Sequence, residues 1–321
     1  MRPGRPSRTA EHNALFRALE SRRPSGDRLV DDQLAEDFLS WPYKALTAPA
    51  RAQIWRDALT RLIDSRWPGV RPTVIARTRM IDEMVTEISN HTPQVVILGA
   101  GFDTRAWRLP CLRDRTVFEV DHPATQHRKR EVLERNRLDH TGVRLIATDF
   151  NLRELAEAMS AAGFDRTLPT LFLWEGTTNY LSADAVDATL RWCARAPADS
   201  HLIFTYINAD VLADPSRYVG ADRVFSTLRR ADEKMTFGFA PDVLADHLGE
   251  RGLELLDDVG AASIRAKVYG RAAQAMRGHE FYRVAHACVG TPSTVGRSAW
   301  SSMTWSASGS SSRPASSFAP R

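Results

Sequence analysis

The feature that most restricts the fold is a regular alternation of short apolar runs and helical stretches between residues 94 and 207. Apolar runs separated by helices of this length pair as parallel strands, because each helix returns the chain across one face of the sheet. We therefore expect an α/β fold with a doubly wound, mostly parallel, Rossmann-like sheet. The expected strands in this part are Gln94–Leu98, Thr116–Val120, Val143–Ala147, Thr170–Trp174 and His201–Ile207.

The segments around this core predict a helical lid. Apolar residues recur every three to four positions through residues 29–90, which predicts an N-terminal helical cap, and a helical insertion is expected within 210–250. Two more strands are expected at Leu253–Asp258 and Tyr282–Val289. We expect three parts: a mobile arm and helix (1–28), one domain with its lid (29–289), and a disordered tail (290–321) in which 11 of 32 residues are Ser.

Composition excludes several classes of protein. The three cysteines form no CxxC pair, so neither a structural metal site nor a disulfide framework is expected. No apolar run approaches the ~20 residues of a membrane span, and the N-terminus lacks a secretory pattern, so we expect a cytoplasmic protein without a membrane partner. The net charge of +4 comes from the two ends of the chain, which argues against a nucleic-acid partner for the folded body.

A glycine loop follows the first expected strand. The run Gln94–Leu98 ends in Gly99-Ala100-Gly101, where the chain must turn sharply and let a ligand approach the backbone. Asp121 ends the next strand, where a carboxylate can accept hydrogen bonds from ribose hydroxyls. Thr104 replaces the third glycine of a dinucleotide loop, which weakens an NAD interpretation. The pattern favours S-adenosylmethionine (SAM), although strand-end glycines can also serve only as turns.

Four further residues lie where a SAM site needs polar or aromatic groups. Asp149 and Phe150 follow the third strand, where an acid can bind the adenine amine and an aromatic ring can flank it; a helix N-cap is the alternative for Asp149. Glu175 follows the fourth strand and should face the carboxyl edge of the sheet, unless it is a surface acid. Arg77 precedes the sheet and can reach the carboxylate of the methionine part, unless it is an exposed helix charge.

Four segments, in order, resemble the leucine carboxyl methyltransferase family: LGAGFDTRAWRL, FEVDHPATQHRKR, TDF and LFLWEGTTNYL. The resemblance covers roughly residues 70–210, with weaker similarity in GHEFYRVAHA near 278–287. WEGTTNYL and HPATQ are similar to bacterial members of aromatic polyketide pathways, of the tetracenomycin carboxyl methyltransferase type. The resemblance implies a class I methyltransferase fold, with SAM bound at Arg77, Gly99, Asp121, Asp149 and Glu175. Phe150, where Leu is common, and the Ser-rich tail depart from the pattern.

The implied function is SAM-dependent O-methylation of a carboxylate on a small aromatic or polyketide acid, in secondary metabolism such as antibiotic biosynthesis. A carboxylate is already ionised at pH 7 and needs only orientation, whereas a phenol with a pKa of about 10 benefits from a base, usually His. A phenolic O-methyltransferase, a protein carboxyl methyltransferase, an NAD-dependent oxidoreductase and a non-catalytic SAM-binding protein stay open as alternatives. The acceptor and the oligomeric state are not fixed by the sequence.

Two residues are the main candidates for the acceptor side, and each has a structural alternative. Tyr180 follows Glu175 by five positions and can contact an acceptor through its hydroxyl or its ring, or it can be a core aromatic. His122 comes directly after Asp121 and is a candidate base, although a lone His is more often structural. Weaker candidates are His201 and His279 as bases and Tyr282 and Arg283 for orienting a carboxylate.

Overall fold

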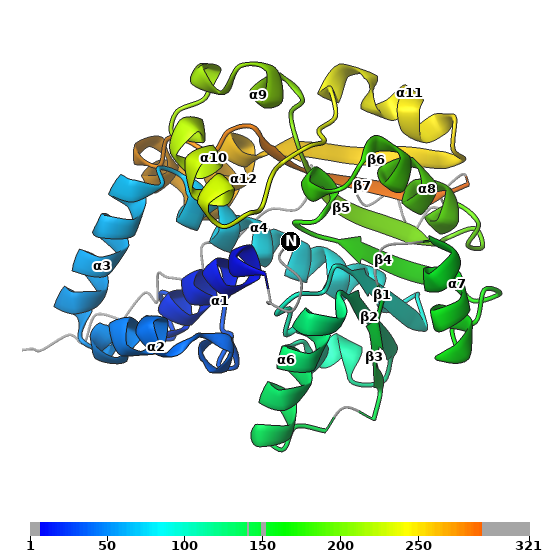
Figure 1. Ribbon diagram of the computed structural model, residues 1–321, viewed down its shortest axis with the longest axis horizontal. Helices are drawn as coiled ribbons and strands as arrows, with labels where there is room; N and C mark the ends of the chain where they lie inside the picture. The colour runs from blue at the N-terminus through cyan, green and yellow to red at the C-terminus, as the bar shows by residue number, and fades with distance from the viewer. Residues whose placement is uncertain (1–6, 140, 149–151, 291–321) are drawn as a thin grey trace, which may run out of the picture.

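The computed structural model describes residues 7–139, 141–148 and 152–290, and these form one sheet flanked by helices (Figure 1). The strand order is β3-β2-β1-β4-β5-β7-β6. All neighbouring strands among β1 to β5 are parallel, and β7 runs antiparallel to both β5 and β6. The predicted doubly wound, mostly parallel fold is thereby confirmed. The strands are β1 (Gln94–Leu98), β2 (Thr116–Asp121), β3 (Val143–Ala147), β4 (Thr170–Trp174), β5 (His201–Ile207), β6 (Leu253–Gly260) and β7 (Tyr282–Val289).

Helices cover both faces of the sheet because its central strands are apolar on both sides. Every residue of β1, β4 and β5 is buried, as expected for parallel strands with helices on both faces. Alternate side chains such as Val95 and Val96 pack against opposite helix layers. One layer comprises α4 (Val70–Ile88), α5 (Arg105–Arg108) and α12 (Ala261–Tyr269), and the other α7 (Leu152–Ala161), α8 (Ala183–Cys193) and α11 (Leu244–Gly249).

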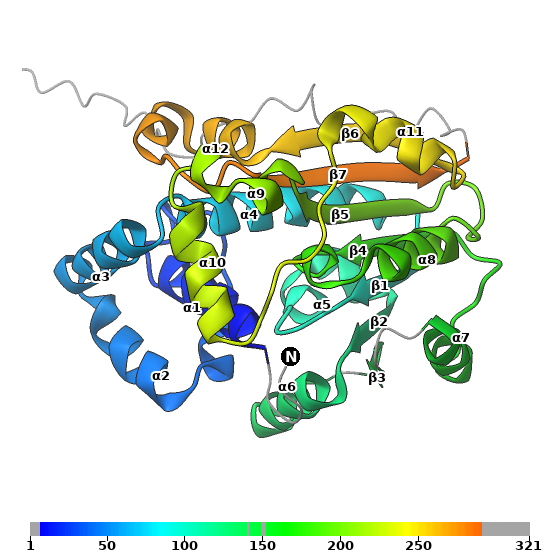
Figure 2. The same cartoon turned by 45° about the horizontal axis from the view of Figure 1, so that its top comes forward.

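A cap of helices lies beyond the carboxyl ends of β1 and β4 (Figures 1 and 2). Its first helix starts at Arg8, because the Ser7 side chain accepts a hydrogen bond from the Ala10 amide and caps it. Apolar residues of the cap before α4, such as Phe16, Phe38 and Ile63, pack in one cluster with Val74 of α4, while the two cap helices that follow β5 contribute to a separate cluster. The cap helices are α1 (Arg8–Ser21), α2 (Trp41–Thr47), α3 (Gln53–Arg66), α9 (Asp210–Ala213) and α10 (Ala221–Arg230).

The remaining elements connect these layers. Helix α6 (Pro123–Arg135) follows β2 and packs on β2 and β3. Within the described part of the chain, no helix is both long and apolar enough to cross a bilayer. Short 3₁₀ turns are η1 (Ala35–Phe38), η2 (Ala48–Arg51), η3 (Pro110–Leu112), η4 (Thr178–Tyr180), η5 (Pro215–Arg217), η6 (Pro241–Val243) and η7 (Gly270–Ala275).

A buried ion pair lies between β2 and α6. The Lys129 ammonium of α6 contacts the Glu119 carboxylate of β2, and both side chains are fully buried. The Lys129 nitrogen also lies 5.4 Å from the centre of the Trp107 ring. Burial raises the pKa of Glu119 to about 7, although the Lys129 charge acts in the opposite direction. Each charge therefore depends on the other for its place in the core.

We expect Lys129→Met to lower the free energy of unfolding by about 3–5 kcal/mol, because it leaves the Glu119 carboxyl buried without its cation. The double variant Glu119→Met/Lys129→Met should recover most of this loss, because it removes both charges and keeps similar volumes. Urea unfolding of the two variants at neutral pH measures the difference. A double variant as unstable as the single one would show that packing, not charge, is lost.

Candidate active site

The glycine loop lies at the point where the strand order reverses. Strand β1 pairs with β2 on one side and β4 on the other, so the loop after β1 opens into the crevice between two outgoing connections. Gly99 and Gly101 have φ angles of +65° and +48°, a region that residues with a Cβ rarely adopt. A Cβ on Gly99 would also lie 2.1 Å from the Thr177 Oγ1. Geometry therefore requires Gly99 and favours a glycine at position 101.

Asp121 is held at the edge of this loop by backbone hydrogen bonds. Its Oδ2 accepts from the Gly101 amide at 2.6 Å, and its Oδ1 accepts from the His122 amide at 2.6 Å. The side chain is mostly buried, and this burial raises the pKa of Asp121. The fixed carboxylate faces the same cavity as the glycine loop and keeps free lone pairs with which to accept further hydrogen bonds.

A first cavity of about 300 Å³ opens over the glycine loop. Its floor comes from the loop after β1, the turn after β2 and the segment after β4. Its roof comes from the amino end of α1, including Thr9 and Asn13, and from Glu233 in the connection after α10. This volume is at the lower end of the range of small-molecule sites. Of the predicted cofactor residues, the structure brings Arg77, Gly99, Gly101, Asp121 and Glu175 to this cavity.

Glu175 is bound by two arginines. Its Oε1 accepts from the Arg77 Nε at 2.7 Å, and its Oε2 accepts from the Arg105 Nη1 at 2.8 Å. Although burial acts to raise it, the two guanidinium groups hold the pKa of Glu175 below its usual value. Arg77 uses only its Nε in this pair, and we find no hydrogen bond of its terminal nitrogens within the described residues. Arg77 lines the cavity and offers a permanent positive charge to a ligand.

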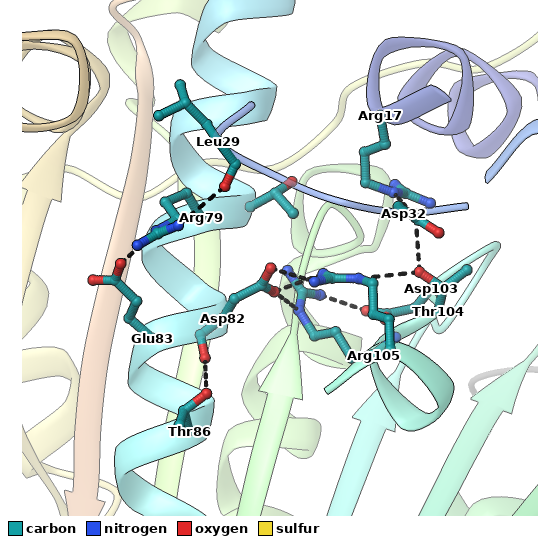
Figure 3. A network of polar contacts seen from close by, with 12 residues as sticks. Arg17, Leu29, Asp32, Arg79, Asp82, Glu83, Thr86, Asp103, Thr104 and Arg105 are labelled. Carbon is teal, nitrogen blue, oxygen red and sulfur yellow. Dashed lines mark hydrogen bonds and ion pairs between the residues drawn. The ribbon is translucent and has the colours of Figure 1, made fainter. Parts of the chain in front are cut away.

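Arg105 extends the network into the core, as Figure 3 shows. Its Nε donates to the Asp82 Oδ1 of α4 at 2.7 Å, and its Nη1 also contacts Asp103. Burial opposes ionisation of Asp103, but Arg105 and two further cations hold its pKa at about 2. Arg108 donates to both oxygens of Asp82 through its two terminal nitrogens. The alternating charges fix the glycine loop against α4.

A second set of contacts joins the loop to α1. The Arg17 Nη2 donates to the Phe102 carbonyl at 2.6 Å, and its Nε donates to the Asp32 Oδ2 at 2.8 Å (Figure 3). The Thr104 hydroxyl donates to the same Asp32 oxygen at 2.7 Å. Thr104 thus has an anchoring role at the position where a dinucleotide loop has its third glycine.

A second, smaller cavity adjoins the first. Its volume is about 90 Å³, and its walls are mainly apolar or aromatic, with Phe16, Trp67, Leu228 and Tyr282 among them. On this wall the Trp67 Nε1 donates to the Thr227 hydroxyl at 3.0 Å, and the His12 Nε2 lies 2.9 Å from the Tyr43 hydroxyl. The two cavities share Thr9, Asn13, Arg77, Gly176 and Tyr180.

The two main acceptor-side candidates lie at different places. Tyr180 lines both cavities, and its hydroxyl lies 3.4 Å from the Thr9 hydroxyl. Burial raises the pKa of the Tyr180 phenol, so it stays protonated and can donate a hydrogen bond. His122 lines only the first cavity, and its Nδ1 accepts from the Ala124 amide as the cap of α6. Their roles stay predictions.

The weaker candidates separate clearly. His279 and Tyr282 line the second cavity. His201 is the first residue of β5 and so lies at the end of the strand away from the cavities, where its Nδ1 is 3.0 Å from the His286 Nε2. Arg283 pairs with Asp258 at 2.8 Å and lines neither cavity. Position and pairing therefore favour the first two as groups that a ligand can contact.

Two predicted cofactor residues cannot be placed, and four residues of the site were not predicted. Asp149 and Phe150 lie outside the described residues, so their roles stay predictions. Sequence reasoning missed Thr9, Asn13, Arg105 and Glu233. Glu233 accepts from the Arg8 amide at 2.9 Å and from the Thr9 hydroxyl, which closes the roof of the first cavity. Among the described residues, no group of three or more acidic, His or Cys side chains is arranged to hold a metal ion.

Comparison with known proteins agrees with this geometry. Residues 10–194 match the family model described as leucine carboxyl methyltransferase, and this segment contains both the glycine loop and Glu175. The chain belongs to the leucine carboxyl methyltransferase family. A Parafrankia relative is 32% identical over 270 residues, covering 81% of this chain and 82% of the relative, and carries the name "putative S-adenosyl-L-methionine-dependent methyltransferase".

Other members of the family match over shorter lengths. A Streptomyces coelicolor relative of the same description is 34% identical over 57% of this chain, and a Rhodococcus jostii relative is 37% identical over 56%. The matches span 62% and 58% of these two proteins, which is less than two thirds of their length.

Solved structures share the fold. A Thermobifida fusca structure, described as a "putative methyltransferase", has a TM-score of 0.57 at 14% identity and covers 90% of this chain and 97% of its own. A Streptomyces avermitilis structure of the DUF574 family has a TM-score of 0.55 at 15% identity, covering 73% of this chain and 90% of its own.

We expect Gly99→Ala to weaken the binding of S-adenosylhomocysteine by about tenfold or more, because the new Cβ forces the loop away from Thr177. The matched control is Gly163→Ala, which has a φ of +86°, no atom within 4 Å of the new Cβ, and no place in either cavity. The control should lose stability but keep its affinity in calorimetric titrations. Equal losses of affinity would contradict a specific role for the loop.

Proposed function

We propose that the protein is a SAM-dependent O-methyltransferase that transfers a methyl group to the carboxylate of a small aromatic or polyketide acid. The observation that carries the proposal is the junction of two cavities, one over the glycine loop and Asp121, the other apolar, with Arg77 in the wall of both. Such a junction lets a donor and an acceptor meet without either displacing the other. The family of the chain and the printed names of its relatives support SAM as the donor.

The residues of the first cavity have complementary roles toward SAM. Asp121 accepts hydrogen bonds from ribose hydroxyls, beside glycines that leave room for the nucleoside. Arg77 offers its terminal nitrogens to the carboxylate of the methionine part or to that of the acceptor. Glu175 orients Arg77 and Arg105 through its two oxygens. SAM supplies a methyl group on a sulfonium, and the task of the protein is to align the acceptor oxygen with it.

A carboxylate acceptor fits the second cavity better than a phenol. Two histidines line its wall, His12 and His279. Burial lowers the pKa of His12, whose Nε2 is paired with the Tyr43 hydroxyl. Burial together with the nearby charges of Arg77 and Arg265 lowers the pKa of His279 to about 3. Such a weak base removes a proton poorly from a phenol whose pKa is about 10. A carboxylate needs no base, and the Tyr180 hydroxyl and Arg77 can orient it through donated hydrogen bonds. The resemblance of WEGTTNYL to polyketide enzymes supports an acid of secondary metabolism.

The donor half of the proposal is tested by titrating the protein with S-adenosylhomocysteine, with NAD as the comparison ligand. We expect binding of S-adenosylhomocysteine at micromolar levels and none of NAD. Asp121→Ala should weaken binding by at least about tenfold, because it removes a charged hydrogen-bond acceptor from the ribose. The matched control is Asp184→Ala on the exposed start of α8. Unchanged binding in Asp121→Ala, or binding of NAD alone, would overturn the donor assignment.

The acceptor half is tested by the pH dependence of methyl transfer. Mass spectrometry measures the transfer as the gain of one methyl group by the acceptor. With a carboxylate acceptor, the rate at saturating SAM should be nearly flat between about pH 6 and 9, because the ordinary carboxyl pKa is about 4. With a phenol, the rate should rise about tenfold per pH unit towards a pKa of about 10. A steep rise over this range would therefore favour the phenolic alternative.

A further inference from the structure

Two side chains in the wall of the second cavity, His279 and Asn179, each have a buried polar atom without a hydrogen bond among the described residues. His279 is 5% exposed, and its Nδ1 is buried without a hydrogen bond among the described residues. The ring stacks on Tyr282, with a centroid distance of 5.1 Å and an interplanar angle of 18°, and meets Phe281 edge-on. Because Nδ1 is enclosed, the Nε2 is the nitrogen that a molecule in the cavity can reach. Buried polar groups without partners are rare, which points to a functional reason for an imidazole at this position.

The backbone at His279 supports a specific role for the side chain. Its φ angle is +60°, in the left-handed region that non-glycine residues seldom adopt. The next glycine towards the N-terminus, Gly278, is packed so that a Cβ would lie 2.5 Å from the Pro68 carbonyl oxygen. The turn therefore presents the imidazole to the cavity at some conformational cost.

The size of the second cavity limits its occupant. Its volume of about 90 Å³ is smaller than the apolar cavity of about 150 Å³ that holds benzene in the best-known engineered case. A single ring is therefore the largest flat group that this space takes, with part of the ring and its polar substituent in the junction to the first cavity, and a fused second ring does not fit. The aromatic walls formed by Phe16, Trp67 and Tyr282 suit a flat ring.

Resting on the proposed function, we propose that the acceptor is a single-ring acid that carries a hydroxyl group, and that the His279 Nε2 selects it by a hydrogen bond to that hydroxyl. The acid group lies at the junction beside Arg77 and Tyr180, and the ring lies between the apolar walls. A hydroxyl both donates and accepts, so it pairs with either tautomer of the imidazole. His279 is thus a specificity-determining residue.

The test uses the protein saturated with S-adenosylhomocysteine and titrated with benzoate and with the ortho, meta and para hydroxybenzoates. In the wild type, one hydroxybenzoate should bind roughly five- to tenfold more tightly than benzoate, the gain of one net hydrogen bond. His279→Phe keeps a ring but removes both nitrogens, so the ratio of hydroxybenzoate affinity to benzoate affinity should fall to about one. His279→Gln keeps a polar nitrogen or oxygen near the Nε2 and should retain part of the preference.

The outcomes separate the two levels of the proposal. Failure of S-adenosylhomocysteine to bind the wild type would overturn the proposed function itself. Normal binding of this ligand by both variants shows that they fold, and a hydroxyl preference that survives in His279→Phe would then overturn the role of His279. Naphthalene and anthracene carboxylates should bind at least about tenfold more weakly than the preferred hydroxybenzoate. Equal or tighter binding of a fused-ring acid, or no binding of any single-ring acid, would overturn the size assignment.

Discussion

The site depends on the shared carboxylate of Glu175. Its two oxygens hold Arg77 of α4 and Arg105 of α5, so one side chain at the end of β4 joins two elements of the same helix layer. Arg105 in turn is held by Asp82 and Asp103. Removing one member of such a buried network leaves a charge without compensation, which costs several kcal/mol. The glycine loop therefore keeps its shape through ion pairs that lie beneath it.

The helical cap contacts the same glycine loop on the side away from Glu175. Arg17 of α1 binds the Phe102 carbonyl, directly after Gly101, and the Asp32 carboxylate accepts from both Arg17 and Thr104. At the amino end of α1, Glu233 binds the Arg8 amide and the Thr9 hydroxyl. Segments from three distant parts of the chain thus meet over one loop. The same contacts that stabilise the cap also enclose the first cavity, which couples folding of the cap to formation of the site.

The sequence predicts the parts of this arrangement that rest on local patterns. The strands follow from apolar runs, and the glycine loop with Asp121 follows from spacing along neighbouring strands. Arg105 is not predictable in the same way, because its importance comes from Asp82 and Glu175, residues that only the folded sheet brings together. The roof is similar: Glu233 follows α10 and meets residues 7–9 across 224 or more positions of sequence. Polar contacts over such separations leave no periodic pattern in the chain.

The two cavities differ in polarity, and this difference suits the proposed reaction. When a carboxylate attacks a sulfonium, one negative and one positive charge disappear, because an ester and a thioether form. The total charge separation therefore falls on the way to the transition state. A poorly hydrated junction destabilises the two separate ions more than it destabilises the transition state, which lowers the barrier. In the proposed reaction the apolar wall around Phe16 and Leu228 favours this loss of charge, and the Arg77 charge in the shared wall attracts the anion before it reacts. A protonated, charged base in the same wall would make the site more polar and weaken this effect. The lowered pKa of His279 keeps that residue neutral.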